Sequence, residues 1–238
     1  MKTLMKIALA IIFVFSIALP SHALDTQAAT TKTKTGWVSL SSGTLNVRSG
    51  PGTTYKKVGS LKNNTQVTVY SQTKNGWSEI RYNNKKAYVM TKYLRMYSYL
   101  MDKTKVYTYK TDGKLYKSSY KGKYYGWDKW ISHNTKEAYL VGEDNKGLYL
   151  GWPESEYYIE IAYPLKVGKT WDYGYEGEGT SKIKSINGTV TTPAGTFKNV
   201  VTVKSSDGYI SYYAPNVGFI KGMEKGKTTS ILVSLVKK

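Results

Sequence analysis

Short runs of alternating apolar and polar residues, separated by turn dipeptides, make up the chain from Gly36 onward. Alternation with a period of two is typical of strands that bury one face. The dipeptides that separate such runs are Asn75-Gly76, Asp112-Gly113, Asn187-Gly188 and Asp207-Gly208. They tolerate the positive φ angles that tight hairpin turns require. Because no helical periodicity follows the N-terminal region, the pattern predicts an all-β, mainly antiparallel protein.

The first 23 residues have the pattern of a secretory signal peptide. Lys2 and Lys6 precede an apolar run of 13 residues, Ile7–Leu19, and small residues follow at the cleavage positions 21–23. A transmembrane helix needs about 20 apolar residues, so this run is short for a permanent N-terminal anchor, which is the alternative. We therefore expect a secreted mature chain that begins near Leu24 and contains no transmembrane segment.

Composition divides the remainder into three parts. Residues 24–35 are rich in Thr, Lys and Ala without apolar periodicity, and we expect them to form a flexible linker. Residues 36–97 are enough for a small barrel, whereas residues 98–238 contain a separate series of longer strands. The boundary at residues 96–101 contains apolar side chains, which argue against a flexible hinge there.

The composition excludes several chemistries. The chain has no cysteine and two histidines, of which His22 lies in the predicted leader. Thiol nucleophiles, disulfides and zinc sites built on cysteine or paired histidines are therefore excluded. Because nucleophile-elbow, P-loop and dinucleotide-binding motifs are also absent, we expect no metal site, no cofactor and no enzymatic activity.

Basic residues are concentrated in the N-terminal part. The chain contains 35 Lys and Arg against 16 Asp and Glu, a net charge of +19 at pH 7. Residues 24–97 hold 12 basic and 2 acidic side chains, and residues 98–238 hold 21 and 14. Such a field attracts polyanions in a salt-dependent manner. Outside a cell we expect these to be wall polymers or lipid headgroups rather than nucleic acid; alternatively, the lysines only keep the protein soluble.

Nine short segments between Gly43 and Leu94 carry a family resemblance. In order they are Leu45–Arg48, Gly50–Gly52, Tyr55, Val58–Leu61, Val67–Val69, Asn75–Trp77, Ile80, Ala87–Val89 and Tyr93–Leu94. This order resembles the bacterial SH3 (SH3b) domain and implies an SH3-like barrel over residues 36–97. It also implies a module that attaches exported proteins to peptidoglycan or associated polymers of the cell wall. Two positions depart from the pattern: Asn63-Asn64 replaces a glycine turn, and Ala87 replaces a glycine, which should narrow the local groove.

Binding of an anionic wall polymer requires exposed basic and aromatic side chains. The candidate contacts are Arg48, Tyr55, Trp77 and Tyr88, together with Arg81, Lys85 and Lys86 on the neighbouring hairpin. The alternative for Trp77 is packing over the barrel core, and the alternative for Arg48 is support of the strand surface.

The sequence of residues 98–238 predicts a β fold but indicates no activity. They are similar to a β-rich domain of exported bacterial proteins and lipoproteins of uncharacterised function, over residues 163–171, 190–201 and 212–221. Glu176 and Glu178 are a repeated acidic pair, but the surrounding glycines predict a solvated loop. Trp127, Trp130 and Trp152 allow a sugar-stacking platform, although strand spacing favours packing for most of them.

The sequence therefore predicts a secreted, wall-associated binding protein with a larger antiparallel β domain of unknown role. Two rivals remain open at this stage. One is a glycan- or wall-acting hydrolase that uses SH3b for targeting and has an unrecognised carboxylate pair. The other is an extracellular protein-interaction module. The oligomeric state does not follow from the sequence.

Overall fold

The computed structural model describes residues 33–40, 42–174 and 178–238. The predicted signal peptide and residues 24–32 of the predicted linker lie outside this part of the chain. Within it, every regular element apart from one 3₁₀ turn is a strand, which confirms the all-β prediction. None of its helices is long and apolar enough to cross a membrane. The same residues contain no cluster of three or more His, Asp or Glu side chains suited to hold a metal ion.

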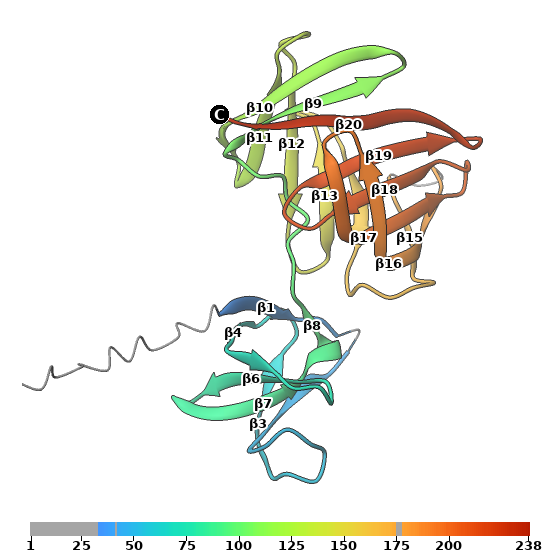
Figure 1. The fold of residues 1–238 in the computed structure, drawn as a ribbon. Helices are drawn as coiled ribbons and strands as arrows, with labels where there is room; N and C mark the ends of the chain where they lie inside the picture. The colour runs from blue at the N-terminus through green and yellow to red at the C-terminus, as the bar shows by residue number, and fades with distance from the viewer. Residues whose placement is uncertain (1–32, 41, 175–177) are drawn as a thin grey trace, which may run out of the picture. The chain divides into compact units, whose positions relative to one another are not determined.

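Residues 34–95 form two small antiparallel sheets (Figure 1). Their elements are β1 (Lys34–Val38), β2 (Thr44–Arg48), β3 (Lys57–Lys62), β4 (Gln66–Val69), β5 (Ser71–Gln72), β6 (Trp77–Tyr82), β7 (Lys85–Met90), the 3₁₀ helix η1 (Thr91–Tyr93) and β8 (Leu94–Arg95). One sheet has the order β4-β1-β8 and the other β3-β2-β7-β6-β5. Strand β1 begins two residues before the expected boundary at Gly36.

Alternation along the strands builds the core of this small barrel. Leu45 and Val47 are buried on β2 while Asn46 between them is exposed, as the period of two predicts. Asn64 adopts a φ of 67°, a left-handed conformation that asparagine tolerates where glycine is usual. The expectation that Ala87 narrows a surface groove is wrong, because Ala87 is 1% exposed and packs inside the core.

The segment after β8 is held by a buried carboxylate. Glu143 pairs with Arg95 at 3.2 Å, and the two side chains are 7% and 8% exposed. Glu143 also accepts hydrogen bonds from the Ser98 hydroxyl and the Tyr99 backbone N–H. The Arg95 guanidinium lies 4.4 Å from the centre of the Tyr163 ring. These contacts lie within one compact unit, residues 32–238.

Residues 105–237 form one antiparallel sheet of 12 strands that curls into a barrel-like shape (Figure 1). The strands are β9 (Lys105–Thr111), β10 (Lys114–Tyr124), β11 (Trp127–Ser132), β12 (Ala138–Glu143), β13 (Gly147–Gly151), β14 (Tyr157–Ala162), β15 (Thr170–Asp172), β16 (Thr180–Thr192), β17 (Gly195–Ser205), β18 (Ile210–Ala214), β19 (Gly218–Glu224) and β20 (Lys227–Lys237). Their order is β14-β13-β12-β11-β10-β9-β20-β19-β18-β17-β16-β15.

The two edges of this sheet approach each other and nearly close the barrel. The Ile159 backbone N–H on β14 donates to the carbonyl of Tyr173, just after β15, at 2.8 Å. The Trp171 indole N–H on β15 donates to the Ile159 carbonyl, also at 2.8 Å. Closure of this kind protects edge strands that would otherwise expose unpaired backbone groups.

Three of the four predicted turn dipeptides lie in turns, and one does not. Asp112 and Gly113 join β9 to β10 with φ angles of 47° and 83°. Asn75-Gly76 and Asp207-Gly208 lie in the turns before β6 and β18. The predicted turn at Asn187-Gly188 is wrong, because β16 continues through it to Thr192. Register shifts on both sides of Gly188 show that the dipeptide forms a bulge, and pairing with β17 resumes beyond it.

The tryptophans of the large barrel have different environments. Trp130 is fully buried and packs edge-on against Tyr107, with ring centres 5.3 Å apart. Trp127 is half-buried between tyrosines, whereas Trp152 is 41% exposed. Burial of Trp130 removes it from any sugar-stacking platform, but it is the one fully buried ring of the three, so the expectation of packing is met in full for Trp130 alone.

Candidate functional site

A row of polar side chains crosses four strands on the outer face of the small barrel. Arg48 on β2 is in register with Tyr88 on β7, Tyr88 with Glu79 on β6, and Glu79 with Ser71 on β5. Directly opposed residues of antiparallel strands project from the same face. Val47, Ile80 and Val89, which alternate with members of this row, are 0% exposed and form the core beneath.

Glu79 is the centre of this face. Its carboxylate accepts from Arg81 at 2.9 Å, pairs with Lys86 at 3.0 Å and accepts from the Ser71 hydroxyl at 3.0 Å. The hydrogen bond from Arg81, with smaller contributions from Lys86 and Ser71, lowers the pKa of Glu79 to about 2. Glu79 therefore remains ionised at neutral pH and holds two basic side chains over the sheet.

The two basic side chains remain accessible and lie beside aromatic rings. The side chains of Arg81 and Lys86 are 41% and 57% exposed. The Arg81 guanidinium lies 4.3 Å from the centre of the Tyr70 ring, and the Lys86 ammonium 5.7 Å from that of Tyr88. This arrangement alternates cationic groups with flat apolar surfaces.

Tyr55 extends the face beyond Arg48. The Arg48 guanidinium donates to the Tyr55 backbone carbonyl at 2.8 Å, and half of the Tyr55 residue surface is exposed. The Tyr55 ring lies directly on Gly50, where an added Cβ would come within 2.3 Å of a ring carbon. Glycine in the turn of residues 50–52 is therefore what allows the ring to rest there.

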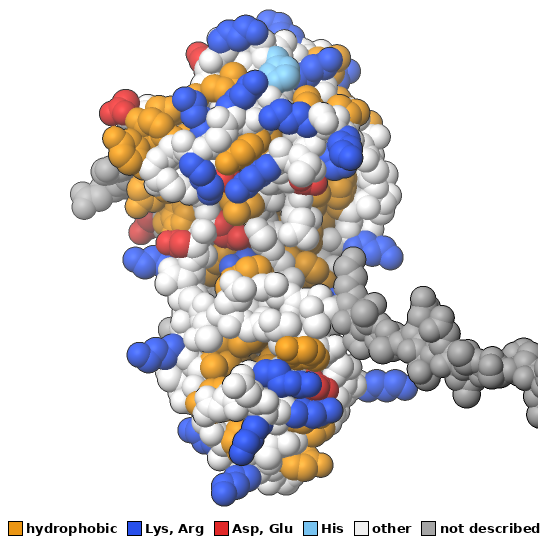
Figure 2. All heavy atoms as spheres, turned by 90° about the vertical axis from the view of Figure 1, so that its left-hand side faces the viewer, with side chains coloured by type: hydrophobic (Ala, Val, Ile, Leu, Met, Phe, Trp, Pro, Cys, Tyr) orange, Lys and Arg blue, Asp and Glu red, His pale blue; other side chains and the backbone are white. Residues whose placement is uncertain are grey.

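We call this surface the basic face. It consists of Arg48, Tyr55, Tyr70, Glu79, Arg81, Lys86 and Tyr88. Figure 2 shows that Lys and Arg side chains outnumber acidic ones on the side of the molecule in view. Within residues 33–97, Glu79 is the sole acid among eleven Lys and Arg, and it is already paired.

The structure brings five of the seven predicted contact residues together: Arg48, Tyr55, Arg81, Lys86 and Tyr88. Lys85 is exposed, but strand alternation directs it to the side opposite Lys86. Trp77 is 6% exposed, so its ring is occupied by packing and we leave it out of the basic face.

Sequence reasoning missed Glu79 and Tyr70. The signal for Glu79 was present, because Glu79 and Arg81 are two residues apart on one strand and must share a face. Tyr70 joins the face only through its ring contact with Arg81, which no spacing rule indicates.

Four glutamates of residues 98–238, including the pair Glu176 and Glu178, do not belong to this face. Glu154 and Glu156 are exposed after β13, and Glu154 accepts a hydrogen bond from the Tyr124 hydroxyl. Glu178 is exposed, and Glu176 lies outside the described residues. His133 shares a 2.8 Å hydrogen bond with the Ser119 hydroxyl.

Replacing Glu79 with glutamine should change the pH dependence of stability. Because the pKa of Glu79 is lower in the folded state than its usual value of about 4.3, the ionised carboxylate stabilises the fold above that value. This stabilisation is lost as the pH falls toward about 2. Urea unfolding of wild type and Glu79→Gln should therefore differ most above about pH 5 and converge toward pH 2. A difference independent of pH would contradict the assignment.

Comparison with known proteins identifies the small barrel. Residues 41–95 match the bacterial SH3 domain family. A probable endopeptidase p60 from Listeria innocua is 40% identical over 77 residues, which is 32% of this chain and 16% of the relative. The corresponding protein from Listeria seeligeri is 47% identical over 78 residues, 32% of this chain and 14% of that relative. The chain thus spans less than a fifth of either relative. No solved structure matches it significantly.

Proposed function

We propose that this protein is a secreted, non-enzymatic binding protein that attaches to the bacterial cell wall through the basic face of its SH3 domain. The ligand is peptidoglycan or an anionic polymer associated with it. The observation that carries the proposal is the coincidence of an SH3 domain at residues 41–95 with a surface of exposed Arg, Lys and Tyr side chains around one ionised Glu79.

Two ranges of interaction contribute. The excess of Lys and Arg attracts an anionic polymer over distances up to the screening length, about 8 Å at physiological ionic strength. At contact, Arg48 and Arg81 each have further N–H donors for phosphate or carboxylate oxygens, because a guanidinium carries about five. Tyr55 and Tyr88 offer ring surfaces to the apolar faces of sugars. Specificity rests on these short-range contacts.

Glu79 reduces the cost of binding by fixing the side chains beforehand. Long basic side chains lose about 0.5–1.5 kcal/mol each when a ligand immobilises them. Arg81 and Lys86 are already held by Glu79, and Arg48 by the Tyr55 carbonyl. A polymer that binds here therefore encounters donors in defined positions.

The endopeptidase name of the relatives favours a hydrolase as the second candidate. The similarity to them covers about a third of this chain, so it leaves most of the large barrel without a counterpart. Incubation of the protein with wall material distinguishes the two candidates. Binding without release of reducing ends, new amino groups or muropeptides supports the proposal, whereas release of any of them supports a hydrolase.

Cosedimentation with purified wall sacculi tests the binding itself. The protein is mixed with sacculi that retain or lack wall teichoic acid, at low salt and at about 1 M salt, where the screening length falls to about 3 Å. We expect retention at low salt on teichoic acid-bearing sacculi and residual retention at high salt. Absence of retention under all four conditions would refute wall binding. If retention disappeared entirely at about 1 M salt, the binding would be nonspecific charge attraction.

A further inference from the structure

The interior of the large barrel is only partly filled by side chains. A closed sheet of about eight strands is just wide enough for side chains to fill, and the diameter grows with strand number. Here the sheet has 12 strands. Trp130, Tyr107 and Ile183, all 0% exposed, fill one region of it. Elsewhere a cavity of about 670 Å³ remains, within the range of about 300–1,000 Å³ typical of small-molecule sites.

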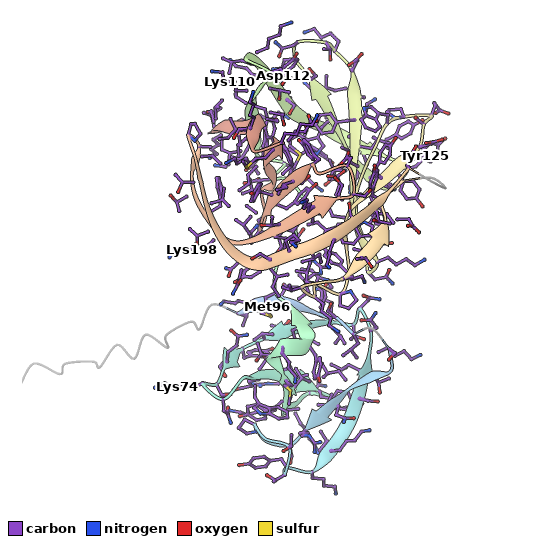
Figure 3. The ribbon with its side chains drawn as sticks, turned by 90° about the vertical axis from the view of Figure 1, so that its right-hand side faces the viewer. Lys74, Met96, Lys110, Asp112, Tyr125 and Lys198 are labelled. Atoms are coloured by element: carbon purple, nitrogen blue, oxygen red, sulfur yellow. The ribbon has the colours of Figure 1, made fainter. Side chains whose placement is uncertain are left out.

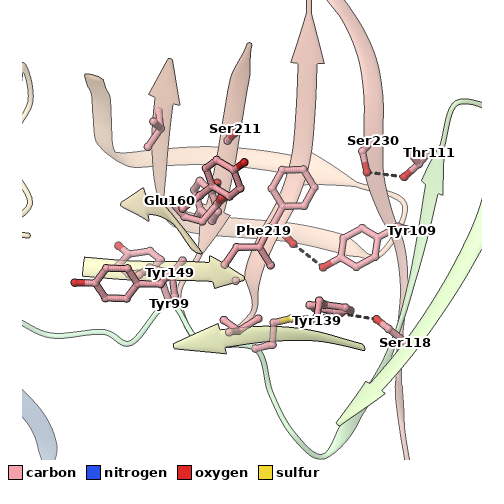
Figure 4. Close-up of a pocket in the computed structure, with 18 of the residues that line it drawn as sticks. Tyr99, Tyr109, Thr111, Ser118, Tyr139, Tyr149, Glu160, Ser211, Phe219 and Ser230 are labelled. Atoms are coloured by element: carbon pink, nitrogen blue, oxygen red, sulfur yellow. Dashed lines mark hydrogen bonds between the residues drawn. The ribbon is translucent and has the colours of Figure 1, made fainter. Parts of the chain in front are cut away.

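Aromatic and aliphatic side chains supply most of the wall of this cavity. Tyr109, Tyr139 and Phe219 line it (Figure 4). Leu148 and Leu150 contribute aliphatic surface. The Tyr109 hydroxyl donates to the Phe219 carbonyl at 2.9 Å, and the Tyr139 hydroxyl shares a 2.8 Å hydrogen bond with Ser118. Because these hydroxyls have protein partners, the rings can present apolar faces to an occupant.

The cavity is acidic, although the protein as a whole is strongly basic. Among the residues that the structure describes, Glu137, Glu160 and Asp207 line it against one basic residue, Lys117. Glu137 and Asp207 are exposed, so the cavity reaches the surface near them. Glu160, labelled in Figure 4, is half-buried and lines the cavity together with several tyrosines. This reversal of charge favours cations inside a molecule whose outer surface favours anions.

Glu160 has one protein partner among the described residues. Strand β14 places its side chain in the cavity, where one carboxylate oxygen accepts a hydrogen bond from the Tyr213 hydroxyl on β18. The other oxygen is left for an occupant. Burial raises the pKa of Glu160, and the hydrogen bond from Tyr213 partly opposes that rise. A cation beside the carboxylate would favour its ionised form.

We propose that the large barrel binds a small amphiphilic cation, with an aromatic or alicyclic body against the tyrosine and leucine wall and an amine paired with Glu160. An anionic occupant is disfavoured because it would be enclosed next to Glu160, and a neutral one would leave the carboxylate without a counter-ion. This site is separate from the basic face, and the inference does not depend on wall binding.

Three matched fluorescent probes test the proposal with the full protein: pyrenylmethylamine, pyrenylmethanol and pyrenecarboxylate. They share one apolar body and differ in charge. Fluorescence anisotropy should show the amine binding about tenfold more tightly than the alcohol, and the carboxylate binding least, because a charge-assisted pair is stronger than a neutral hydrogen bond. Equal binding of the three probes, tightest binding of the carboxylate, or no binding at all would overturn the proposal.

Variants locate the binding. Glu160→Gln keeps the shape of the side chain and should abolish the preference for the amine over the alcohol. Ser211→Trp places a large ring in the cavity and should weaken binding of all three probes. Glu224→Gln removes the same charge from an exposed hairpin and should behave as wild type. Circular dichroism verifies that each variant is folded. A preference that survives in folded Glu160→Gln, or binding unaffected by Ser211→Trp, would refute the assignment.

Discussion

Replacing Arg48, Arg81 and Lys86 with glutamine together should weaken binding to wall sacculi by about tenfold or more. Exposed ion pairs contribute up to about 1 kcal/mol each, so the loss of three gives an effect of this order. All three side chains belong to one face, whose register the pairing of β2, β7 and β6 fixes. The effect should appear in the dissociation constant at low salt and shrink at about 1 M salt, where charge is screened.

The matched control removes three charges from the same domain but outside the basic face. Lys62, Lys74 and Lys92 are exposed (Lys74 is labelled in Figure 3), and replacing them with glutamine changes the net charge equally. We expect this variant to lose clearly less affinity than the first. Equal losses would show that net charge, rather than the basic face, determines binding.

Replacing Trp130 with alanine should cost about 3–5 kcal/mol of unfolding free energy, the range for large aromatic side chains in protein cores. Trp130 is 0% exposed and packs against Tyr107 and Tyr120, with ring centres 5.3 and 5.8 Å away. Its removal would enlarge a barrel interior that already contains a cavity. Chemical denaturation of the full protein measures the loss.

Trp130→Phe separates packing from polarity. The Trp130 indole N–H is buried and has no hydrogen-bond partner among the described residues. Phenylalanine keeps most of the ring and removes this unsatisfied donor, which itself costs free energy in the folded state. We expect Trp130→Phe to lose less than half of the unfolding free energy that Trp130→Ala loses. Equal losses in the two variants would mean that ring packing does not hold this part of the barrel.

The alternation of apolar and polar residues along the chain predicted the fold class and most strands of the small barrel. The alternation of Leu45 and Val47 with polar neighbours fixed which face of β2 is buried. The family resemblance located the domain. Five of the basic and aromatic candidates lie together because alternation places them on one face and the pairing of β2, β7 and β6 aligns them. The 6% exposure of Trp77 favours packing, the alternative that the sequence had left open, because residue type and spacing alone do not show whether a ring faces solvent.

Less of the large barrel than of the small one could be predicted from the sequence. The Asn187-Gly188 dipeptide has turn chemistry, yet pairing of β16 with β17 on both sides outweighs that local preference. The cavity depends on the number of strands and the closure of β14 with β15, which are long-range properties. Glu160 lies in an ordinary alternating run, so only the folded barrel reveals that it faces an interior lined by tyrosines.

Hydrogen exchange of the full protein, free and bound to teichoic acid-bearing sacculi, tests most directly whether the basic face is the binding surface. We predict slower exchange on binding in peptides that cover β2 with the following turn, residues 44–56, and the β6–β7 hairpin, residues 77–90. The large barrel should exchange as in the free protein. Protection confined to residues 105–237, or no protection in a sample shown to be bound, would contradict the account.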